Sequence, residues 1–117
     1  MFEREFSRTD RVKSMLHKEL AILLRDALKD PRIDGVSISW LKLSPDMGVA
    51  TVYVNNLDEK RVEASVEALN HAAGFLRARL GRILKLRSVP HLRFHRDEAQ
   101  ERGARIDALL AKVARKH

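Results

Sequence analysis

The sequence contains no cysteine, which excludes disulfide bonds, thiol catalysis and zinc sites built on cysteine. Its longest uninterrupted apolar run is residues 20–24, far shorter than the roughly 20 residues that a membrane-spanning helix needs. Residues 1–6 also lack the apolar core of a secretion signal. These absences predict a soluble, cytoplasmic protein that does not associate with membranes.

Positive charge is concentrated in the second half of the chain. The 117 residues, which fit a single domain, include 23 basic and 16 acidic side chains, for a net charge of +7. Residues 1–60 contain ten of each sign, so the whole excess lies in residues 61–117. No Asp or Glu occurs from 68 to 96, a stretch with six arginines and one lysine. This cluster predicts a polyanionic partner such as RNA or DNA; a basic face kept for solubility is the alternative.

Apolar periodicity predicts a helix followed by two strands. Ser7 and Asp10 form a capping-box pattern, and an apolar stripe at helical spacing follows until the Asp-Pro pair at 30–31. Residues 36–40 and 49–54 alternate as strands do, and the change of apolar phase after residue 40 predicts a twist or bulge. We expect these strands to pair antiparallel across a turn in which Gly48 supplies a positive φ.

A long apolar stripe from residue 59 to 86 is interrupted by Gly74. One helix of this length would span about 40 Å, more than a domain of this size comfortably holds. Glycine also costs about 1 kcal/mol relative to alanine inside a helix. We therefore predict two helices joined at residues 72–74, with Leu80 and Ile83 on the buried face of the second. A straight helix that tolerates Gly74 is the alternative.

The remaining pattern predicts a third strand at 91–95 and a terminal helix at 98–114. The order helix, strand, strand, helix–kink–helix, strand predicts an α+β sandwich, with three strands covered on one face by helices. This is the arrangement of a type II KH-like fold. We expect one core and no parallel strand pairing. The predicted core residues are Leu16, Leu20, Leu23, Val52, Val54, Leu69, Leu76, Leu80 and Phe94.

Short sequence blocks, in a shared order over nearly the whole chain, resemble the ribosome-binding factor A family. The blocks are RTDRV (8–12), DPR (30–32), LSPD (43–46), ATVYV (50–54), AAGFLR (72–77), LR (86–87), PHLRF (90–94), Asp97, RI (105–106) and LL (109–110). In that family an Ala-x-Gly kink between two helices replaces the usual Gly-x-x-Gly loop of KH domains. Residues 72–74 match this kink.

The resemblance implies a factor that binds the free small ribosomal subunit and precursor 16S rRNA, and that assists late maturation and 5′-end processing. It implies no enzymatic activity and no cofactor, and we expect the free protein to be a monomer. Residues 1–97 are assigned to a KH-like RNA-binding domain and residues 98–117 to its helical extension. With the basic cluster, the resemblance gives these predicted RNA-binding residues: Ala72, Ala73, Gly74, Arg77, Arg79, Arg82, Lys85, Arg87 and Arg93.

Helical geometry predicts where these cations point. At 100° per residue, Arg82 and Lys85 lie nearly opposite the buried face of the second helix, and Arg77 and Arg79 lie on its flanks. Arg93 alternates with inward-facing residues of the third strand and therefore points to the far face of the sheet.

Little in the chain suggests catalysis or a metal. His91 and His95 are the only histidines at metal-ligand spacing, and no third ligand lies near them in the sequence, so no metal site is predicted. Trp40 and Tyr53 are interpreted as strand packing rather than as platforms for base stacking. Two alternatives to rRNA binding remain: a basic protein-interaction module that docks on an acidic partner, and a generic DNA-binding domain.

Overall fold

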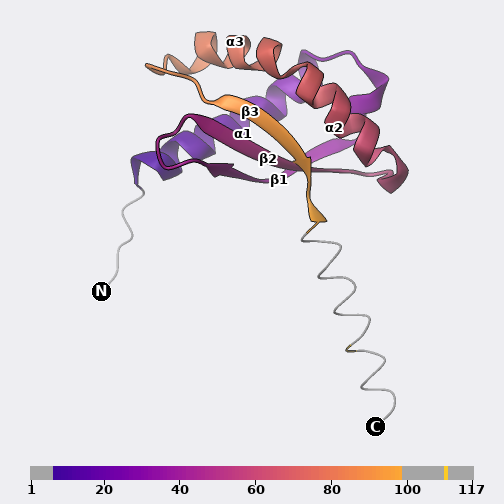
Figure 1. Ribbon diagram of the computed structural model, residues 1–117. Helices are drawn as coiled ribbons and strands as arrows, with labels where there is room; N and C mark the ends of the chain where they lie inside the picture. Colours follow the sequence, from indigo (N-terminus) through magenta and orange to yellow (C-terminus); the bar gives the residue numbers. More distant parts are fainter. Residues whose placement is uncertain (1–6, 99–109, 111–117) are drawn as a thin grey trace.

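The structure is a computed structural model, and it describes residues 7–98 and Leu110 (Figure 1). The predicted terminal helix lies outside these residues apart from Glu98 and Leu110. The elements are α1 (Arg8–Asp26), η1 (Pro31–Ile33), β1 (Val36–Leu43), β2 (Val49–Asn56), η2 (Glu59–Arg61), α2 (Val62–His71), α3 (Ala73–Leu84) and β3 (His91–Arg96). This is the predicted order, with two short 3₁₀ turns added. No helix in the described part of the chain is long and apolar enough to cross a membrane.

Helix α1 begins as its sequence predicts. The Ser7 hydroxyl accepts a hydrogen bond from the Asp10 backbone N–H at 3.1 Å, and the Asp10 carboxylate accepts one from the Ser7 N–H at 3.2 Å. Together these bonds satisfy donors that a helix N-terminus leaves open. The helix ends at Asp26, before the pre-proline residue Asp30. Asp30 in turn caps η1 by accepting a hydrogen bond from the Arg32 N–H at 2.9 Å.

The sheet has the order β1-β2-β3 and is mixed. β1 and β2 pair antiparallel, as predicted, whereas β2 and β3 pair parallel, with Val52 opposite Phe94. The expectation that no strands pair parallel was therefore wrong. β3 runs parallel to β2 because of the connection between them. α2 and α3 carry the chain back across one face of the sheet, and such a crossover returns the next strand in the same direction.

β1 contains the predicted irregularity. Ile38 pairs with Val54 and Trp40 with Tyr53, so Ser39 is an extra residue without a partner position. A bulge of this kind bends a strand and changes its side-chain phase. Before it Ile38 faces the helices, and after it Leu41 does, which leaves Trp40 on the opposite side.

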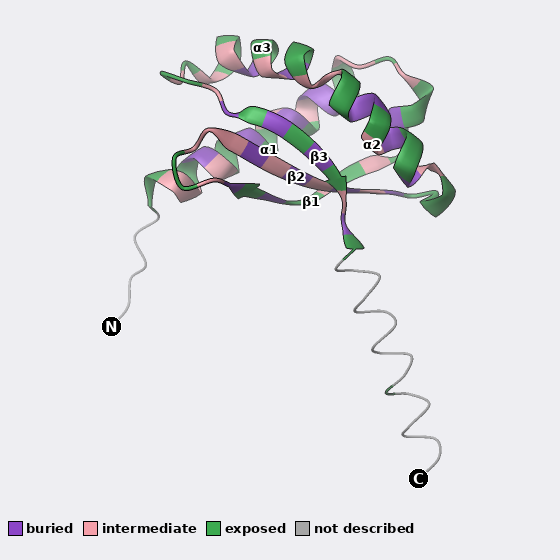
Figure 2. Cartoon of the chain, viewed as in Figure 1, coloured by how far each residue is buried: buried purple, intermediate pink, exposed green. Residues whose placement is uncertain are grey.

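All three helices cover the same face of the sheet, as Figure 1 shows, and the core lies between the two layers. The nine predicted core residues are all buried. Figure 2 shows the alternation of buried and exposed residues along the strands that this packing produces. The other face of the sheet carries exposed or half-buried side chains.

The turn between β1 and β2 differs from the prediction in one residue. Met47, rather than Gly48, adopts the left-handed conformation, with φ 57°. A Cβ at Gly48 would lie 3.1 Å from Asp46 Oδ1, a tight contact that a larger residue could adopt only if the Asp46 carboxylate shifted. That carboxylate accepts hydrogen bonds from the Gly48 N–H at 2.9 Å and the Ser44 hydroxyl at 2.7 Å. The turn therefore closes around Asp46.

Candidate nucleic-acid interface

The two-helix prediction is confirmed: α2 ends at His71 and α3 begins at Ala73. The break is at Ala72, whose ψ of 0° departs from the helical value of about −42°. Figure 1 shows that the two helix axes run at an angle to each other. Ala72 still accepts a hydrogen bond from the Leu76 N–H at 2.9 Å, so the chain turns without losing its backbone bonding.

A groove opens beside this kink, between the first turns of α3 and the start of β3. It has a volume of about 480 Å³ and is lined by Ala73, Gly74, Arg77, Ala78, His91 and Leu92. Small side chains on α3 make its helical wall shallow, so backbone is accessible there. Arg77 and His91 supply polar groups at opposite walls. The groove could hold an extended segment of backbone or a flat base.

Gly74 has no role in packing. Its φ is not positive, and a Cβ added to it would meet no atom within 4 Å. The glycine is therefore not required by the fold, which would accept alanine and gain helix propensity. What glycine does provide is close access to the α3 backbone from the groove side. This favours an external contact at the kink over a conformational role.

Phe75 is a candidate site residue that the sequence reasoning missed. Its side chain is 46% exposed, and the Arg79 guanidinium lies 5.6 Å from the ring centroid. Stacked cations and exposed rings suit contacts with bases as well as with phosphates. Its helical position could have indicated this exposure, because Phe75 does not belong to the apolar stripe of α3 that contains Leu76 and Leu80.

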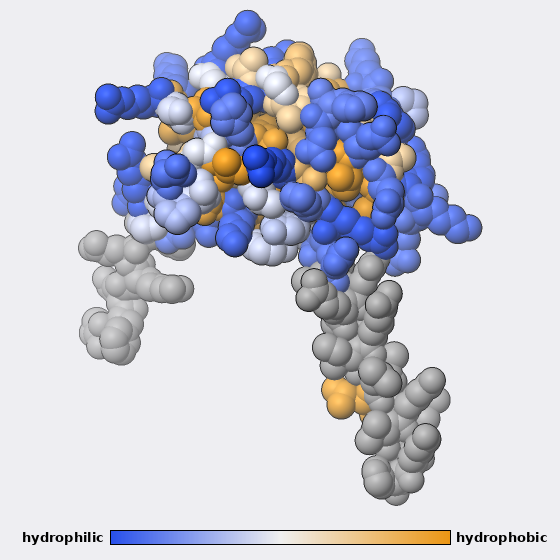
Figure 3. Space-filling model, viewed as in Figure 1, coloured by the Kyte–Doolittle hydropathy of each residue, from blue (hydrophilic) through white to orange (hydrophobic). Residues whose placement is uncertain are grey.

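Several predicted cations form one exposed surface on and after α3. Arg79 and Arg82 are exposed on the helix, and Lys85 and Arg87 are exposed in the loop that follows it. None of these four forms an ion pair with another residue that the structure describes. Their positive charge is therefore not compensated locally, as the acid-free sequence indicated. Figure 3 shows that hydrophilic side chains dominate the visible face, with apolar patches between them.

Three other residues of the predicted helix and strand do not belong to this cationic surface. Arg77 is half-buried, and its Nε donates a hydrogen bond to the Val89 carbonyl at 3.0 Å, so it also ties α3 to the loop before β3. Ile83, predicted on the buried face, is 43% exposed. The apolar stripe turns slowly around the helix, and α3 ends one residue later, so Leu84 rather than Ile83 continues the contact. Arg93 lies on the far face of the sheet, as predicted, and is separated from the α3 cations.

Polar contacts fix α2 and thereby the position of the kink. The Asn70 side chain pairs with the backbone of Phe94: its Oδ1 accepts from the Phe94 N–H at 2.8 Å, and its Nδ2 donates to the Phe94 carbonyl at 3.0 Å. Asn70 thus satisfies part of the open edge of β3. At the other end of α2, buried Ser65 accepts a hydrogen bond from Asn56 Nδ2 at 2.9 Å. Asn56 Nδ2 also donates to the Asp34 carbonyl.

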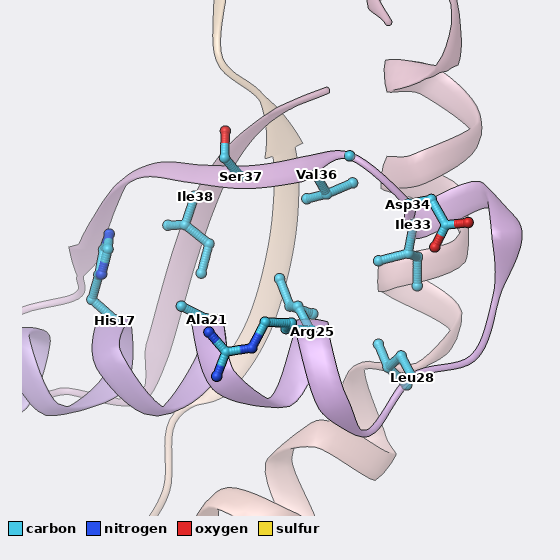
Figure 4. Close-up of a pocket in the computed structure, with 11 residues that line it drawn as sticks. His17, Ala21, Arg25, Leu28, Ile33, Asp34, Val36, Ser37 and Ile38 are labelled. Atoms are coloured by element: carbon cyan, nitrogen blue, oxygen red, sulfur yellow. The ribbon is translucent and has the colours of Figure 1, made fainter. Parts of the chain in front are cut away.

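A second hollow, of about 470 Å³, lies between α1 and β1 (Figure 4). Val36 and Ile38 point from β1 toward α1, whereas Ser37 points away. The walls of the hollow combine apolar side chains with His17 and Arg25 of α1 and with Asp34, which precedes β1. Arg25 is already paired with Asp26 at 3.1 Å. The hollow therefore lacks the convergent polar groups of a reactive site.

Together, the fold and the open groove at the kink define an α+β domain of the KH type with a basic surface. The chain belongs to the ribosome-binding factor A family, which matches residues 8–110. A ribosome-binding factor A from Chromohalobacter salexigens is 46% identical over 110 residues, covering 92% of this chain and 84% of the relative.

Solved structures agree in fold. The crystal structure of ribosome-binding factor A from Thermus thermophilus has a TM-score of 0.68 at 32% identity, covering 74% of this chain and 91% of that one. A homology model of the Thermus thermophilus factor, as fitted into a cryo-electron-microscopy map of a complex of the 30S subunit with that factor, gives a TM-score of 0.65 at 33% identity. It covers 75% of this chain and 93% of that one. The α+β architecture of this family is therefore the architecture of this chain.

Proposed function

We propose that this protein binds the free small ribosomal subunit and precursor 16S rRNA, and assists late maturation and 5′-end processing of that rRNA. In this role it acts in the cytoplasm as a monomer, by binding rather than by catalysis. Family membership supports the proposal, and so does the 30S complex of the Thermus thermophilus relative. We assign binding to residues 1–97 and treat residues 98–117 as an extension of that domain.

The observation that carries the proposal is the uncompensated cationic surface beside the groove at Gly74. Arg79 and Arg82 on α3 and Arg87 in the next loop have no acidic partner in the described structure. Cations held together in this way are stabilised by a polyphosphate backbone, which releases its condensed counterions when they bind. The groove lets the backbone of α3 approach that ligand closely. A phosphate chain along the cations with a base at the groove satisfies both features.

A charge-reversal experiment tests the proposal. Arg79→Glu with Arg82→Glu should abolish co-sedimentation with free small subunits, while the circular dichroism spectrum and melting temperature stay nearly unchanged, because both side chains are exposed. Any remaining RNA binding should have a salt slope smaller by about one to two units. Arg77 is left intact because it bonds to Val89.

The matched control is Lys29→Glu with Lys60→Glu, which makes the same change in net charge at exposed positions outside the groove. This control should still co-sediment. Equal loss in both variants would show that total charge, not this surface, governs binding. Undiminished binding by the Arg79 and Arg82 variant would refute the interface. Preference for duplex DNA over rRNA, or a ribonuclease-resistant complex with an acidic protein, would favour the two alternative functions.

A further inference from the structure

The face of the sheet opposite the helices carries an ordered row of aromatic side chains. Trp40 pairs across the strands with Tyr53, and Tyr53 with His95. The Trp40 and Tyr53 rings are stacked, with centroids 4.2 Å apart and planes 7° from parallel, and the His95 ring follows at 6.1 Å. Trp40 remains 44% exposed. These rings do pack, as their sequence suggested, but on one another and outside the core.

One side of this row remains open for a further ring. Tyr53 covers one face of the Trp40 indole, and β1 is an edge strand, so no strand among the described residues lies beyond it. Trp40 also lines a shallow hollow of about 400 Å³, together with Lys13, His17 and Lys18 of α1. A planar group placed on the indole face that Tyr53 does not cover would extend the stack by one layer. A nucleic-acid base has the required shape and an apolar π-face.

The charge around the row is complementary to a phosphate backbone. Lys42 pairs across the strands with Thr51, and Thr51 with Arg93, which makes a second row beside the aromatic one. Lys42 and Arg93 are both exposed. The three strands contain no acidic residue, and the hollow adds Lys18 and Lys13, the latter 3.8 Å from Asp10. The row of rings and the row that contains Lys42 and Arg93 thus lie side by side on this face, where a base and its phosphates could be contacted together.

We infer that this open sheet face is a second RNA-contact surface, which binds an unpaired, single-stranded segment by stacking a base on Trp40 and placing phosphates near Lys42 and Arg93. The surface lies on the opposite side of the sheet from the groove at Gly74 and does not depend on it. A second copy of the chain is a poor occupant, because a two-fold contact would bring Lys42 and Arg93 of both copies together without acidic partners in the strands.

Trp40 is the only tryptophan, so its fluorescence reports on this surface alone. Titration of the full chain with a short, unstructured oligouridylate should quench Trp40 emission, because stacking brings a base against the indole. An abasic strand of the same length carries the phosphates without the bases, and should leave emission nearly unchanged. An oligodeoxyuridylate distinguishes RNA from DNA. Binding detected by fluorescence anisotropy of a labelled oligouridylate, with no change in Trp40 emission, would overturn the inference.

Variants separate this surface from the groove. Trp40→Ala should fold with a slightly lower melting temperature, because its stacking on Tyr53 is lost, and should weaken oligouridylate binding about tenfold. Lys42→Ala with Arg93→Ala keeps the Trp40 reporter, and should lower the salt slope by about one unit. Arg79→Glu with Arg82→Glu should lose small-subunit association yet retain Trp40 quenching.

Two results would contradict the inference while leaving the proposed small-subunit binding intact. One is subunit binding with no Trp40 quenching by oligouridylate. The other is a concentration-dependent dimer, seen by analytical ultracentrifugation, that Trp40→Ala dissociates. Conversely, if quenching persists while the parent protein fails to associate with small subunits, the proposed function fails and the inference stands.

Discussion

Asn70 shows how one side chain can hold two elements of this fold together. It is the residue of α2 that bonds both backbone groups of Phe94, on the side of β3 that no strand in the described part of the chain covers. A side-chain amide can do this because it offers one donor and one acceptor in the geometry of a peptide group.

We expect Asn70→Ala to lower the free energy of unfolding by about 1–2 kcal/mol, since the Phe94 N–H and carbonyl lose their partners. Urea denaturation followed by circular dichroism measures the loss. Glu67→Ala, one turn earlier on an exposed position of α2, is the control and should change stability by less than about 0.5 kcal/mol. Equal stabilities of the Asn70 variant and the parent would mean that solvent replaces these bonds at no cost.

Lys85 combines a candidate binding charge with an unfavourable backbone conformation. It ends α3 in the left-handed region, with φ 49°, where a side chain costs about 1 kcal/mol and glycine costs nothing. Lys85→Gly should therefore raise the free energy of unfolding by about 0.5–1 kcal/mol while weakening association with small subunits. Lys85→Ala removes the same charge without relieving the backbone, so it should weaken binding equally and not stabilise. Different binding losses in the two variants would contradict this separation of charge from conformation.

At the scale of elements, apolar phase predicted α1 and the three strands, and Gly74 together with the length of the stripe predicted the break between α2 and α3. Pairing direction was not predictable in this way, because it depends on how α2 and α3 cross the sheet rather than on any residue of β3. The residue with a positive φ in the turn between β1 and β2 was also predicted wrongly. Gly48 was expected to adopt this conformation, whereas Met47 does, and Gly48 instead lies against the carboxylate of Asp46.

Gly74 is the element-scale test of the kink. Because a Cβ there meets nothing, Gly74→Leu should keep or raise the melting temperature, yet it should impair small-subunit association by filling the groove. Gly81→Ala is the control in the same helix; its Cβ would meet Val89 at an ordinary 3.5 Å, outside the groove. Melting curves and co-sedimentation are measured on the same preparations. Normal association by the Gly74 variant would remove the kink from the interface.

At the scale of the whole molecule, the predicted binding residues divide between two surfaces. Sequence placed the α3 cations and Arg93 in one acid-free stretch, and helical and strand periods indicated that Arg93 faces elsewhere. The exposure of Phe75 was open to prediction from its phase in α3, whereas the aromatic row could not be predicted, because it depends on which residues pair across the strands. Arg77 was predicted as a surface charge on the flank of α3. Its hydrogen bond to the Val89 carbonyl could not be predicted, because it joins residues twelve positions apart.

Acid stability is a second property of the whole molecule. Hydrogen bonds and charge from Arg32 lower the pKa of Asp30 below its ordinary value, and bonds from Ser44 and Gly48 lower the pKa of Asp46. A carboxyl whose pKa is lower in the folded state stabilises the fold above its unfolded pKa, near 3.8, and this contribution disappears as pH falls through the lower folded value.

Asp30→Asn with Asp46→Asn should therefore melt at a lower temperature than the parent at neutral pH. The difference should shrink as the pH falls below about 4, because the parent carboxyls then become protonated and lose the charge that the asparagines of the variant already lack. Thermal melts across this pH range measure the effect. A difference that is constant with pH would show that shape rather than charge accounts for it. Glu59→Gln, an exposed carboxyl outside both turns, provides the baseline.

The bulge at Ser39 gives β1 one residue that it can spare. Deleting a residue from a strand normally moves every following side chain to the opposite face of the sheet. Here Ile38 and Leu41, on either side of the extra residue Ser39, already face the helices. Removal of Ser39 would restore strict alternation, at the cost of its 2.6 Å bond from Asn55, about 1 kcal/mol. We expect that deletion to fold, whereas deletion of Thr51 from central β2 should not. Chain length can therefore vary by one residue at position 39 without disturbing the core.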